Sequence, residues 1–331
     1  MDQGDTDASA TLAAPACFRV AYSDASSRGL LDQPGTLAVF DFDDAAPAGA
    51  DPRWLRVSQA ALATPAPREH WTVAAEVSHG FEAGLHWSRG GGWQFVAIEA
   101  DETAPGGIET ACEFVYDRLL THVAASPERH LLRIWNYLDR INEGEGDAER
   151  YRLFCSARAR SMAAHGLSDY PAATAIGHHG PRGRLQVYAL CATRAGAALE
   201  NPRQLSAWAY PRQYGPTAPS FARAMRLPRD GLAISGTAAV IGHASHHAGH
   251  VAAQVEEAVA NLCALLERAA LPPFDAASPL KVYVRRPDDA GAVQAALAAT
   301  LDPAVPRLLL RGDICRRELL VEIDGWRFAA L

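Results

Sequence analysis

The sequence contains the same order of elements twice, and this repeat limits the folds that the chain can adopt. The second half contains, in order, a strand, a helix, a strand, a helix and two strands: residues 231–242, 250–270, 280–286 and 288–301, then "RLLLRGDI" and "ELLVEIDGWRF". The first half has the same order: residues 93–100, 108–125, 130–141, 146–166, 173–179 and 183–194. Each half therefore predicts a β-α-β-α-β-β unit with its helices on one face of a mixed sheet.

The two units predict an α/β protein with layered α+β character. We divide the chain into an N-terminal segment over 1–75, a first repeat over 76–197, a connector over 198–230 and a second repeat over 231–331. The first residues, up to about residue 15, are acidic and lack the pattern of a signal peptide, so we expect a disordered tail. The connector is rich in proline and aromatic residues, and its length favours an ordered segment that lines a site.

Composition excludes several classes of function. The 331 residues carry a net charge of −7, which argues against general nucleic-acid binding. Lys281 is the single lysine, so an anion site must use arginine, which suits bidentate carboxylate binding. The six cysteines form no C-x-x-C pair, so neither a zinc site nor a disulfide framework is predicted. The sequence contains no run of about 18 apolar residues, so we expect no membrane span. The scattered cysteines fit reduced thiols in a cytoplasmic protein.

The last predicted strand carries a carboxylate in an apolar setting. Glu322 lies between Val321 and Ile323, on the opposite face of the strand from both. Such a position removes water from the carboxyl group and raises its pKa, as a general acid requires. Spacing alone favours a different interpretation, a partly exposed strand glutamate paired with Arg311 or Arg317.

This layout resembles the YjgF/RidA superfamily. The resemblance lies in the "SGTAAV" strand, the "VAAQVEEAVANL" helix and the closing "VPR…LLVEIDGW" segment. It implies an arginine that grips a substrate carboxylate, at Arg307, and a glutamate on the last strand, at Glu322. The first repeat has no arginine at the matching place in "YPAATAIG", and Gln186 stands where the glutamate would be. We therefore expect the chemistry in the second repeat.

The chain as a whole is more specifically similar to the chorismatase family, whose two-repeat members act on chorismate. Four stretches between about residue 80 and the end carry this similarity: "LLRIWNYLDRINEGEGDAERYRLFCSAR", "YPAATAIG", "NPRQLSAWAYPRQYGPTAPSFARA" and "SGTAAVIGHASHHAGHVAAQ". The hydroxybenzoate-forming members are the nearest. The resemblance implies release of pyruvate from chorismate, giving 3-hydroxybenzoate, 4-hydroxybenzoate or both. It implies no cofactor, and we expect a monomer whose partner is a small-molecule substrate, with no nucleic acid and no membrane.

The resemblance also implies roles for residues near the ring of the substrate. Glu322 is the expected general acid, which protonates the methylene carbon of the enolpyruvyl group. Cys315 matches a pocket cysteine that helps to direct the ring toward aromatisation, whereas by itself it reads as a small buried hydrophobic residue. Ala238 and Ala239, which follow "SGT", are expected to shape the pocket that sets the product.

Two carboxylates on the substrate require two anion clamps. Tyr151 and Arg158 are seven residues apart on one predicted helix, so two turns place them on one face. That spacing alone also fits a solvated arginine and a half-buried tyrosine. The connector supplies the other contacts that the resemblance implies, Tyr210 and Arg223, and two further candidates, Tyr214 and Arg203.

Histidines cluster in "GHASHHAGH" at intervals of three and four residues. A helical segment with this spacing could bind zinc. Gly242 and Gly249 interrupt the segment, so helix capping and loop hydrogen bonds are the expected roles, and no metal site is assigned.

Two other functions fit the repeat pattern. One is an imine or enamine hydrolase of the general YjgF/RidA kind, which would share the arginine and glutamate but not need the connector contacts. The other is a non-catalytic protein that binds a small acid, because one fold can serve both catalysis and binding.

Overall fold

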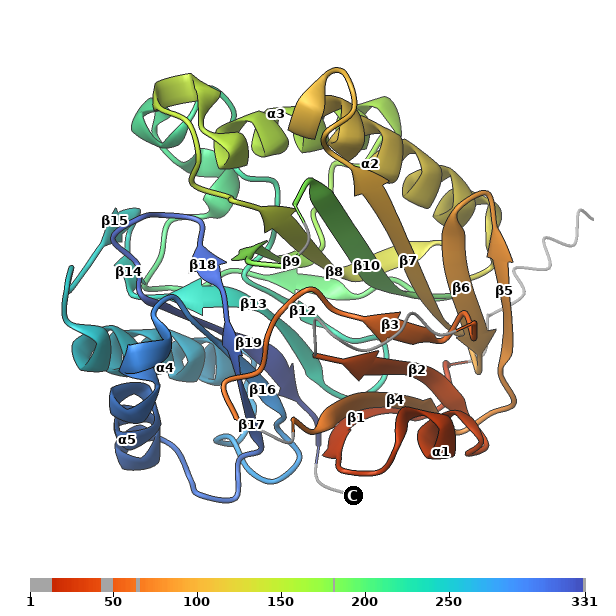
Figure 1. Cartoon of the computed structure of the whole chain (residues 1–331). Coiled ribbons are helices and arrows are strands. Elements are labelled where there is room, and N and C mark those ends of the chain that lie inside the picture. Colours follow the sequence, from red (N-terminus) through yellow and green to blue (C-terminus); the bar gives the residue numbers. More distant parts are fainter. Residues whose placement is uncertain (1–13, 43–49, 64–65, 181, 330–331) are drawn as a thin grey trace, which may run out of the picture.

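The structure is a computed structural model that describes residues 14–42, 50–63, 66–180 and 182–329. Three β-sheets surround a common core, and two pairs of helices cover the outer faces of two of them (Figure 1). Most of the predicted disordered tail, residues 1–13, lies outside the described residues. No helix of the described part is long and apolar enough to cross a membrane.

The first repeat has the predicted order of elements. They are β7 (Trp93–Asp101), α2 (Gly107–Ala125), β8 (His130–Asp139), the 3₁₀ turn η1 (Gly146–Ala148), α3 (Arg150–Ala164), β9 (Ala172–His178) and β10 (Arg184–Ala192). Strands β8 and β9 are parallel, and β10 lies antiparallel between β8 and β7. The prediction of a β-α-β-α-β-β unit in a mixed sheet is confirmed here.

The second repeat follows the same order. Its elements are β13 (Leu232–Ala238), α4 (Val251–Arg268), β16 (Leu280–Val284), the 3₁₀ turn η4 (Pro287–Asp289), α5 (Ala290–Thr300), β17 (Arg307–Arg311), β18 (Asp313–Ile314) and β19 (Val321–Arg327). A short hairpin, β14 (Val240–Ile241) and β15 (Ala244–Ser245), precedes α4. In Figure 1, α4 and α5 lie on one side of this sheet.

The N-terminal segment, where the sequence predicted no elements, forms a third sheet. Its elements are β1 (Phe18–Ser23), α1 (Ser27–Leu31), β2 (Thr36–Asp41), β3 (Trp54–Arg56) and β4 (Arg68–Val73). The hairpin β5 (Ser78–Glu82) and β6 (Leu85–Gly90) then extends the sheet of the first repeat beyond β7.

The connector is ordered throughout. It contains β11 (Ala197–Leu199), the 3₁₀ turns η2 (Ala207–Ala209) and η3 (Arg212–Tyr214), and β12 (Ala224–Arg226). The strand orders are β1-β4-β2-β3, β18-β9-β8-β10-β7-β6-β5 and β11-β12-β13-β19-β16-β17. Strand β18 belongs to the second repeat but pairs with β9 of the first, so the two repeats are interlocked.

The alternation of the strands explains the layers. In β19, Val321 and Ile323 pack with the residues of α4 and α5, whereas Trp326 packs in the central core. The central core contains aromatic residues from all three sheets, including Trp71 and Trp135. Glu322 and Asp324 alternate with the helix-facing residues, so the strand directs both carboxyl groups away from the helices.

The two repeats match residue by residue at their last strands. In the second repeat Glu322 pairs with Tyr283 of β16, and in the first repeat Gln186 pairs with Tyr137 of β8. The two tyrosine hydroxyls meet at 2.9 Å in the centre of the molecule. The interface between the repeats therefore has two related grooves, one beside Glu322 and one beside Gln186.

The groove beside Gln186 is filled by the chain itself. The backbone N–H of Ser58 donates to the Gln186 amide oxygen at 3.2 Å, and the Gln186 amide nitrogen donates to the carbonyl of Arg56 at 2.8 Å. The following residues run along β17, where Leu62 donates to the carbonyl of Leu309. The N-terminal segment thus occupies the first of the two grooves.

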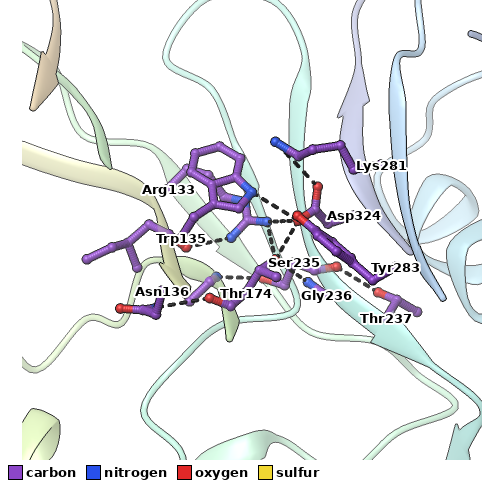
Figure 2. Close-up of polar contacts among 12 residues, drawn as sticks. Arg133, Trp135, Asn136, Thr174, Ser235, Gly236, Thr237, Lys281, Tyr283 and Asp324 are labelled. Atoms are coloured by element: carbon purple, nitrogen blue, oxygen red, sulfur yellow. Dashed lines mark hydrogen bonds and ion pairs between the residues drawn. The ribbon is translucent and has the colours of Figure 1, made fainter. Parts of the chain in front are cut away.

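Charged groups are buried where the three sheets meet (Figure 2). The carboxyl oxygen Oδ2 of Asp324 accepts hydrogen bonds from Trp135 Nε1 at 2.9 Å and Tyr283 OH at 3.0 Å. Arg133 lies 3.2 Å from the same oxygen. Lys281, the single lysine, is 1% exposed and pairs with Glu69 of the third sheet at 2.9 Å.

Candidate active site

A cavity of about 690 Å³ opens in the groove beside Glu322. Helix α3 and strand β9 of the first repeat form one wall, and β13, β19 and the 315–319 loop of the second repeat form another. The connector, the 145–149 segment, Asn136 of β8 and Val240 of β14 supply the rest of the lining. The sequence-predicted residues that line this cavity are Glu322, Cys315, Tyr151, Arg158, Tyr210, Tyr214, Arg223 and Ala238.

Glu322 lines the cavity, and the residue is 5% exposed. Burial raises the pKa of its carboxyl group to about 8, and the nearby negative charge of Asp324 acts in the same direction. Arg133, Arg223 and Arg285 oppose this shift. The carboxyl group forms none of the ion pairs found among the described residues, so neither Arg311 nor Arg317 neutralises it. The group is therefore held in its protonated form near neutral pH.

Arg158 projects from α3 and is held by neutral partners. Its Nε donates to Tyr116 OH at 2.6 Å, and its Nη1 donates to the carbonyl of Ser220 at 2.6 Å. Its Nη2 is buried and has no hydrogen-bond partner among the described residues. A buried guanidinium with an open donor and no carboxylate beside it is suited to bind an anion.

Tyr151, two turns before Arg158 on α3, also lines the cavity. Burial raises the pKa of its hydroxyl well above the ordinary value, and Cys155, Cys315 and Glu322 contribute to the same shift. The hydroxyl therefore stays protonated and can donate a hydrogen bond. The predicted placement of Tyr151 and Arg158 on one face of a helix agrees with the structure.

Arg223, on the connector, also lines the cavity. Its Nη2 donates to the carbonyl of Leu205 at 2.8 Å and to Tyr210 OH at 2.6 Å, while its Nε is buried without a partner. The rings of Tyr210 and Tyr214 contact each other in a tilted arrangement, with centroids 5.4 Å apart. The connector therefore places a second partly unpaired guanidinium in the cavity.

Cys315 lines the cavity on the loop between β18 and β19. Burial, together with the nearby Glu322, raises the pKa of its thiol to about 12, so the thiol remains protonated. Arg285 fixes this loop because it donates to the carbonyls of Ile314, Arg316 and Leu319.

Three predicted residues lie outside the cavity lining. Arg203 pairs with Glu257 at 2.6 Å and donates to Asn261 at 2.7 Å, so it fastens the connector to α4. Ala239 is fully buried in a small apolar cluster behind the cavity. Arg307 lies at the start of β17.

The position of Arg307 follows from the repeat. Arg307 pairs with Leu280, three residues before Tyr283, and Ala173 pairs with Ile134, three residues before Tyr137. Ala173 is thus the first-repeat counterpart of Arg307, and it lines the cavity. The groove beside Glu322 lies between β19 of the second repeat and β9 of the first. The groove beside Gln186 lies between β10 of the first repeat and β17 of the second. Arg307 therefore belongs to the groove beside Gln186.

The sequence analysis did not select several residues of the site. Asn136, Thr174, Gly236 and Arg316 all line the cavity. Asn136 and Thr174 are polar residues with apolar neighbours on both sides in the sequence, and that exception was the available signal. Arg316 packs over the ring of Tyr214 at 3.8 Å from its centroid, a contact between distant segments that no local pattern predicts.

The histidine cluster makes separate local contacts. His243 Nδ1 lies 3.1 Å from Tyr214 OH, and His247 Nε2 lies 3.2 Å from Glu257. Among the described residues, no group of three or more His, Cys, Asp or Glu side chains is arranged to hold a metal ion.

Known proteins resemble this chain over most of its length. The family model described as "Chorismatase FkbO/Hyg5-like, N-terminal" matches residues 69–191. A 3-hydroxybenzoate synthase from Streptomyces hygroscopicus is 34% identical over 276 residues, which cover 78% of this chain and 80% of the relative. A chorismatase from the same organism is 36% identical over 273 residues and covers 78% of each chain. A crystal structure of a chorismatase superposes with a TM-score of 0.85 at 29% identity, over 96% of this chain and all of the other.

The fold and the site define a class: tandem-repeat α/β proteins in which an inter-repeat cavity is lined by a buried carboxyl group and two buried guanidinium groups. Within that class, identities above 30% over 78% of the chain decide the family. The chain belongs to the chorismatase family.

Proposed function

We propose that this protein removes pyruvate from chorismate and forms hydroxybenzoate. The buried carboxyl group of Glu322 in the lining of a cavity that also contains Arg158 and Arg223 is the observation that carries the proposal. The names of the relatives, 3-hydroxybenzoate synthase and chorismatase, agree with it. The reaction balances without a further reactant, because chorismate less pyruvate has the composition of hydroxybenzoate.

Glu322 acts as the general acid. Its proton is transferred to the methylene carbon of the enolpyruvyl group, which becomes the methyl group of pyruvate. The adjacent carbon then carries positive character, the bond between the ring and the ether oxygen breaks, and the electron pair forms the pyruvate carbonyl. A carboxyl group whose pKa is about 8 holds the required proton at neutral pH. Loss of a ring proton completes aromatisation and restores the carboxyl group.

Arg158 and Arg223 bind the two carboxylates of the substrate. Each is buried, each has an unpaired N–H, and neither pairs with a protein carboxylate at salt-bridge distance. Tyr151 assists Arg158, and Tyr210 assists Arg223. Two guanidinium groups also offset the cost of bringing a dianion to a protein with a net charge of −7.

Cys315 and Ala238 contact the ring and determine the product. If the ring hydroxyl displaces pyruvate internally, an epoxide forms and opens to 3-hydroxybenzoate. Direct elimination gives 4-hydroxybenzoate. A protonated thiol beside Glu322 can donate a weak hydrogen bond to the ring oxygen and is small enough to leave room for the ring to turn.

Incubation with chorismate tests the proposal. Pyruvate is measured by a coupled dehydrogenase assay and the aromatic acids by chromatography, and we expect one hydroxybenzoate for each pyruvate. Ammonia release from an imino acid without pyruvate release from chorismate would favour the imine hydrolase. Binding of chorismate without turnover would favour a binding protein.

We also propose that the protein is a monomer. Three sheets from a single chain enclose the central core, and the cavity is built from both repeats and the connector of that chain. Light scattering after size-exclusion chromatography should give a mass near 35.4 kDa. A mass of two or three times this value would contradict the proposal.

A further inference from the structure

Strand β13 contains a bulge beside the acid. Ile234 pairs with Gly325 and Thr237 pairs with Ile323, so β13 has one residue more than β19 over this interval. The bulge, Ser235–Gly236, is defined by this extra residue. A bulge bends one strand and changes the direction in which its neighbours point.

Gly236 provides the space for the carboxyl group of Glu322. A Cβ atom added at Gly236 would overlap the carboxyl oxygen Oε1 and lie 2.8 Å from Cδ. The carboxyl group therefore rests against the backbone of the bulge, and a side chain at this position would displace it. Space rather than backbone conformation is what requires glycine at Gly236.

The hydroxyl of Thr174 holds the bulge in place (Figure 2). It accepts a hydrogen bond from the Gly236 N–H at 3.0 Å and donates to Asp324 Oδ2 at 2.8 Å. Arg133 Nη2 donates to the same hydroxyl. Because a hydroxyl has one proton and Asp324 accepts it, the lone pairs of Thr174 are directed toward Gly236 and Arg133.

Ser235 connects the bulge to the second arginine clamp. Its N–H donates to the carbonyl of Arg223 at 3.1 Å, and its hydroxyl donates to the carbonyl of Ala222 at 2.5 Å. The Ser235 hydroxyl also accepts from the N–H of Ala173 at 2.9 Å. One bulge thus contacts the acid, the connector and β9 of the first repeat.

We propose that Thr174 is a positioning residue, which fixes the Ser235–Gly236 bulge and thereby sets the location of the Glu322 carboxyl group relative to Arg223. This inference rests on the proposed function of Glu322 as the acid. Thr174 lies on β9 of the first repeat, whereas the acid lies on the second, so the hydroxyl aligns the two repeats at the point of reaction. Asp324 acts through Thr174 in this arrangement and does not itself line the cavity.

The matched variants Thr174→Val and Thr174→Ser test the proposal. Valine keeps the shape of threonine but cannot bond to Gly236 or Asp324, whereas serine keeps the hydroxyl. We expect Thr174→Val to lower kcat about tenfold to a hundredfold with KM changed less than about threefold, because misplacement of a reacting group affects the chemical step. Thr174→Ser should retain kcat within about threefold. Equal kcat in wild type and Thr174→Val, or equal losses in both variants, would overturn the proposal.

Gly236→Ala provides a second test that leaves the Thr174 side chain intact. The added methyl group should displace the Glu322 carboxyl group and lower kcat at least as much as Thr174→Val does. Crystal structures of Thr174→Val and Gly236→Ala provide a readout that needs no activity. A Glu322 carboxyl group that keeps its wild-type position in Thr174→Val would refute the inference. If wild type releases no pyruvate from chorismate, the proposed function fails, and the structure of Thr174→Val still decides whether Thr174 positions the carboxyl group.

Discussion

Glu322 and Gln186 occupy matching positions in the two repeats. Glu322 pairs with Tyr283 on the neighbouring strand, and Gln186 pairs with the equivalent Tyr137. Their surroundings differ. Glu322 faces a cavity, whereas Gln186 donates to Glu99 and to the carbonyl of Arg56 in a filled groove. The same strand position therefore has a structural role in the first repeat and faces the cavity in the second.

Replacement of Glu322 by glutamine should abolish most turnover. The amide has nearly the same shape but no acidic proton, so we expect kcat for pyruvate release to fall by about 10²–10⁴-fold with KM little changed. Glu256→Gln, at an exposed position on α4, is the matched control and should leave kcat unchanged. Wild-type kcat in Glu322→Gln would remove this residue from the mechanism.

The pH dependence of activity should follow the carboxyl group of Glu322. Its pKa in the folded protein is raised to about 8, so the acid is protonated below this pH and ionised above it. We expect kcat/KM to be level from about pH 6 to about pH 7.5 and to fall tenfold for each further pH unit above about 8. If kcat/KM already declines as the pH rises from about 4 to about 6, the acid has the ordinary pKa of a carboxyl group, and this result would contradict an acid that is protonated at neutral pH.

The same shift makes stability depend on pH. The pKa of Glu322 is raised above the value of 4.5 that applies to the unfolded chain, so the folded state binds one more proton between about pH 4.5 and 8. This group therefore lowers the free energy of unfolding as the pH rises through that window, by a few kcal/mol in all, on the order expected for one buried carboxyl. Urea titrations of wild type and Glu322→Gln at pH 5, 7 and 9 should show the difference between them growing with pH.

Replacement of Arg158 by lysine should weaken substrate binding. Lysine keeps the positive charge but loses the planar guanidinium and its contacts with Tyr116 and Ser220. We expect KM for chorismate to rise about tenfold to a hundredfold, as for the loss of a charge-assisted hydrogen bond. Arg160→Lys, at an exposed position on the same helix, is the control. Similar KM values in the two variants would argue against Arg158 as a clamp.

Chemical labelling of Lys281 should report the unfolding of the protein. Its amine is 1% exposed and lies 2.9 Å from Glu69, and it is the single lysine in the sequence. We expect an amine-reactive reagent to leave Lys281 unmodified in the native protein and to modify it at the rate of global unfolding in urea. Peptide mass spectrometry separates this residue from the amino terminus. Rapid labelling of Lys281 without urea would show that this part of the core opens independently.

The sequence predicted the repeated units well because their signals are local. Alternation in β19 and the apolar stripe of α4 depend on residues a few positions apart. The N-terminal sheet escaped prediction because it lies outside the repeat, so no second copy of its pattern supported it, and its strands pack against the other two sheets. Arg307 could not be assigned to its groove from sequence, because that assignment depends on which repeat faces which. The pairing of Thr174 with Gly236 joins residues 62 positions apart and leaves no periodic pattern.

The location of the cavity between the repeats has a consequence for dissecting the gene. Arg158 and Thr174 come from one half of the polypeptide, whereas Glu322 and Cys315 come from the other, with Arg223 on the segment that joins them. A fragment that ends after the first repeat holds one clamp, Arg158, without a proton donor, and the complementary fragment holds the donor and Arg223 without the cavity wall formed by α3 and β9. Truncation should therefore abolish catalysis outright, and two separately expressed fragments should recover it only upon reassociation.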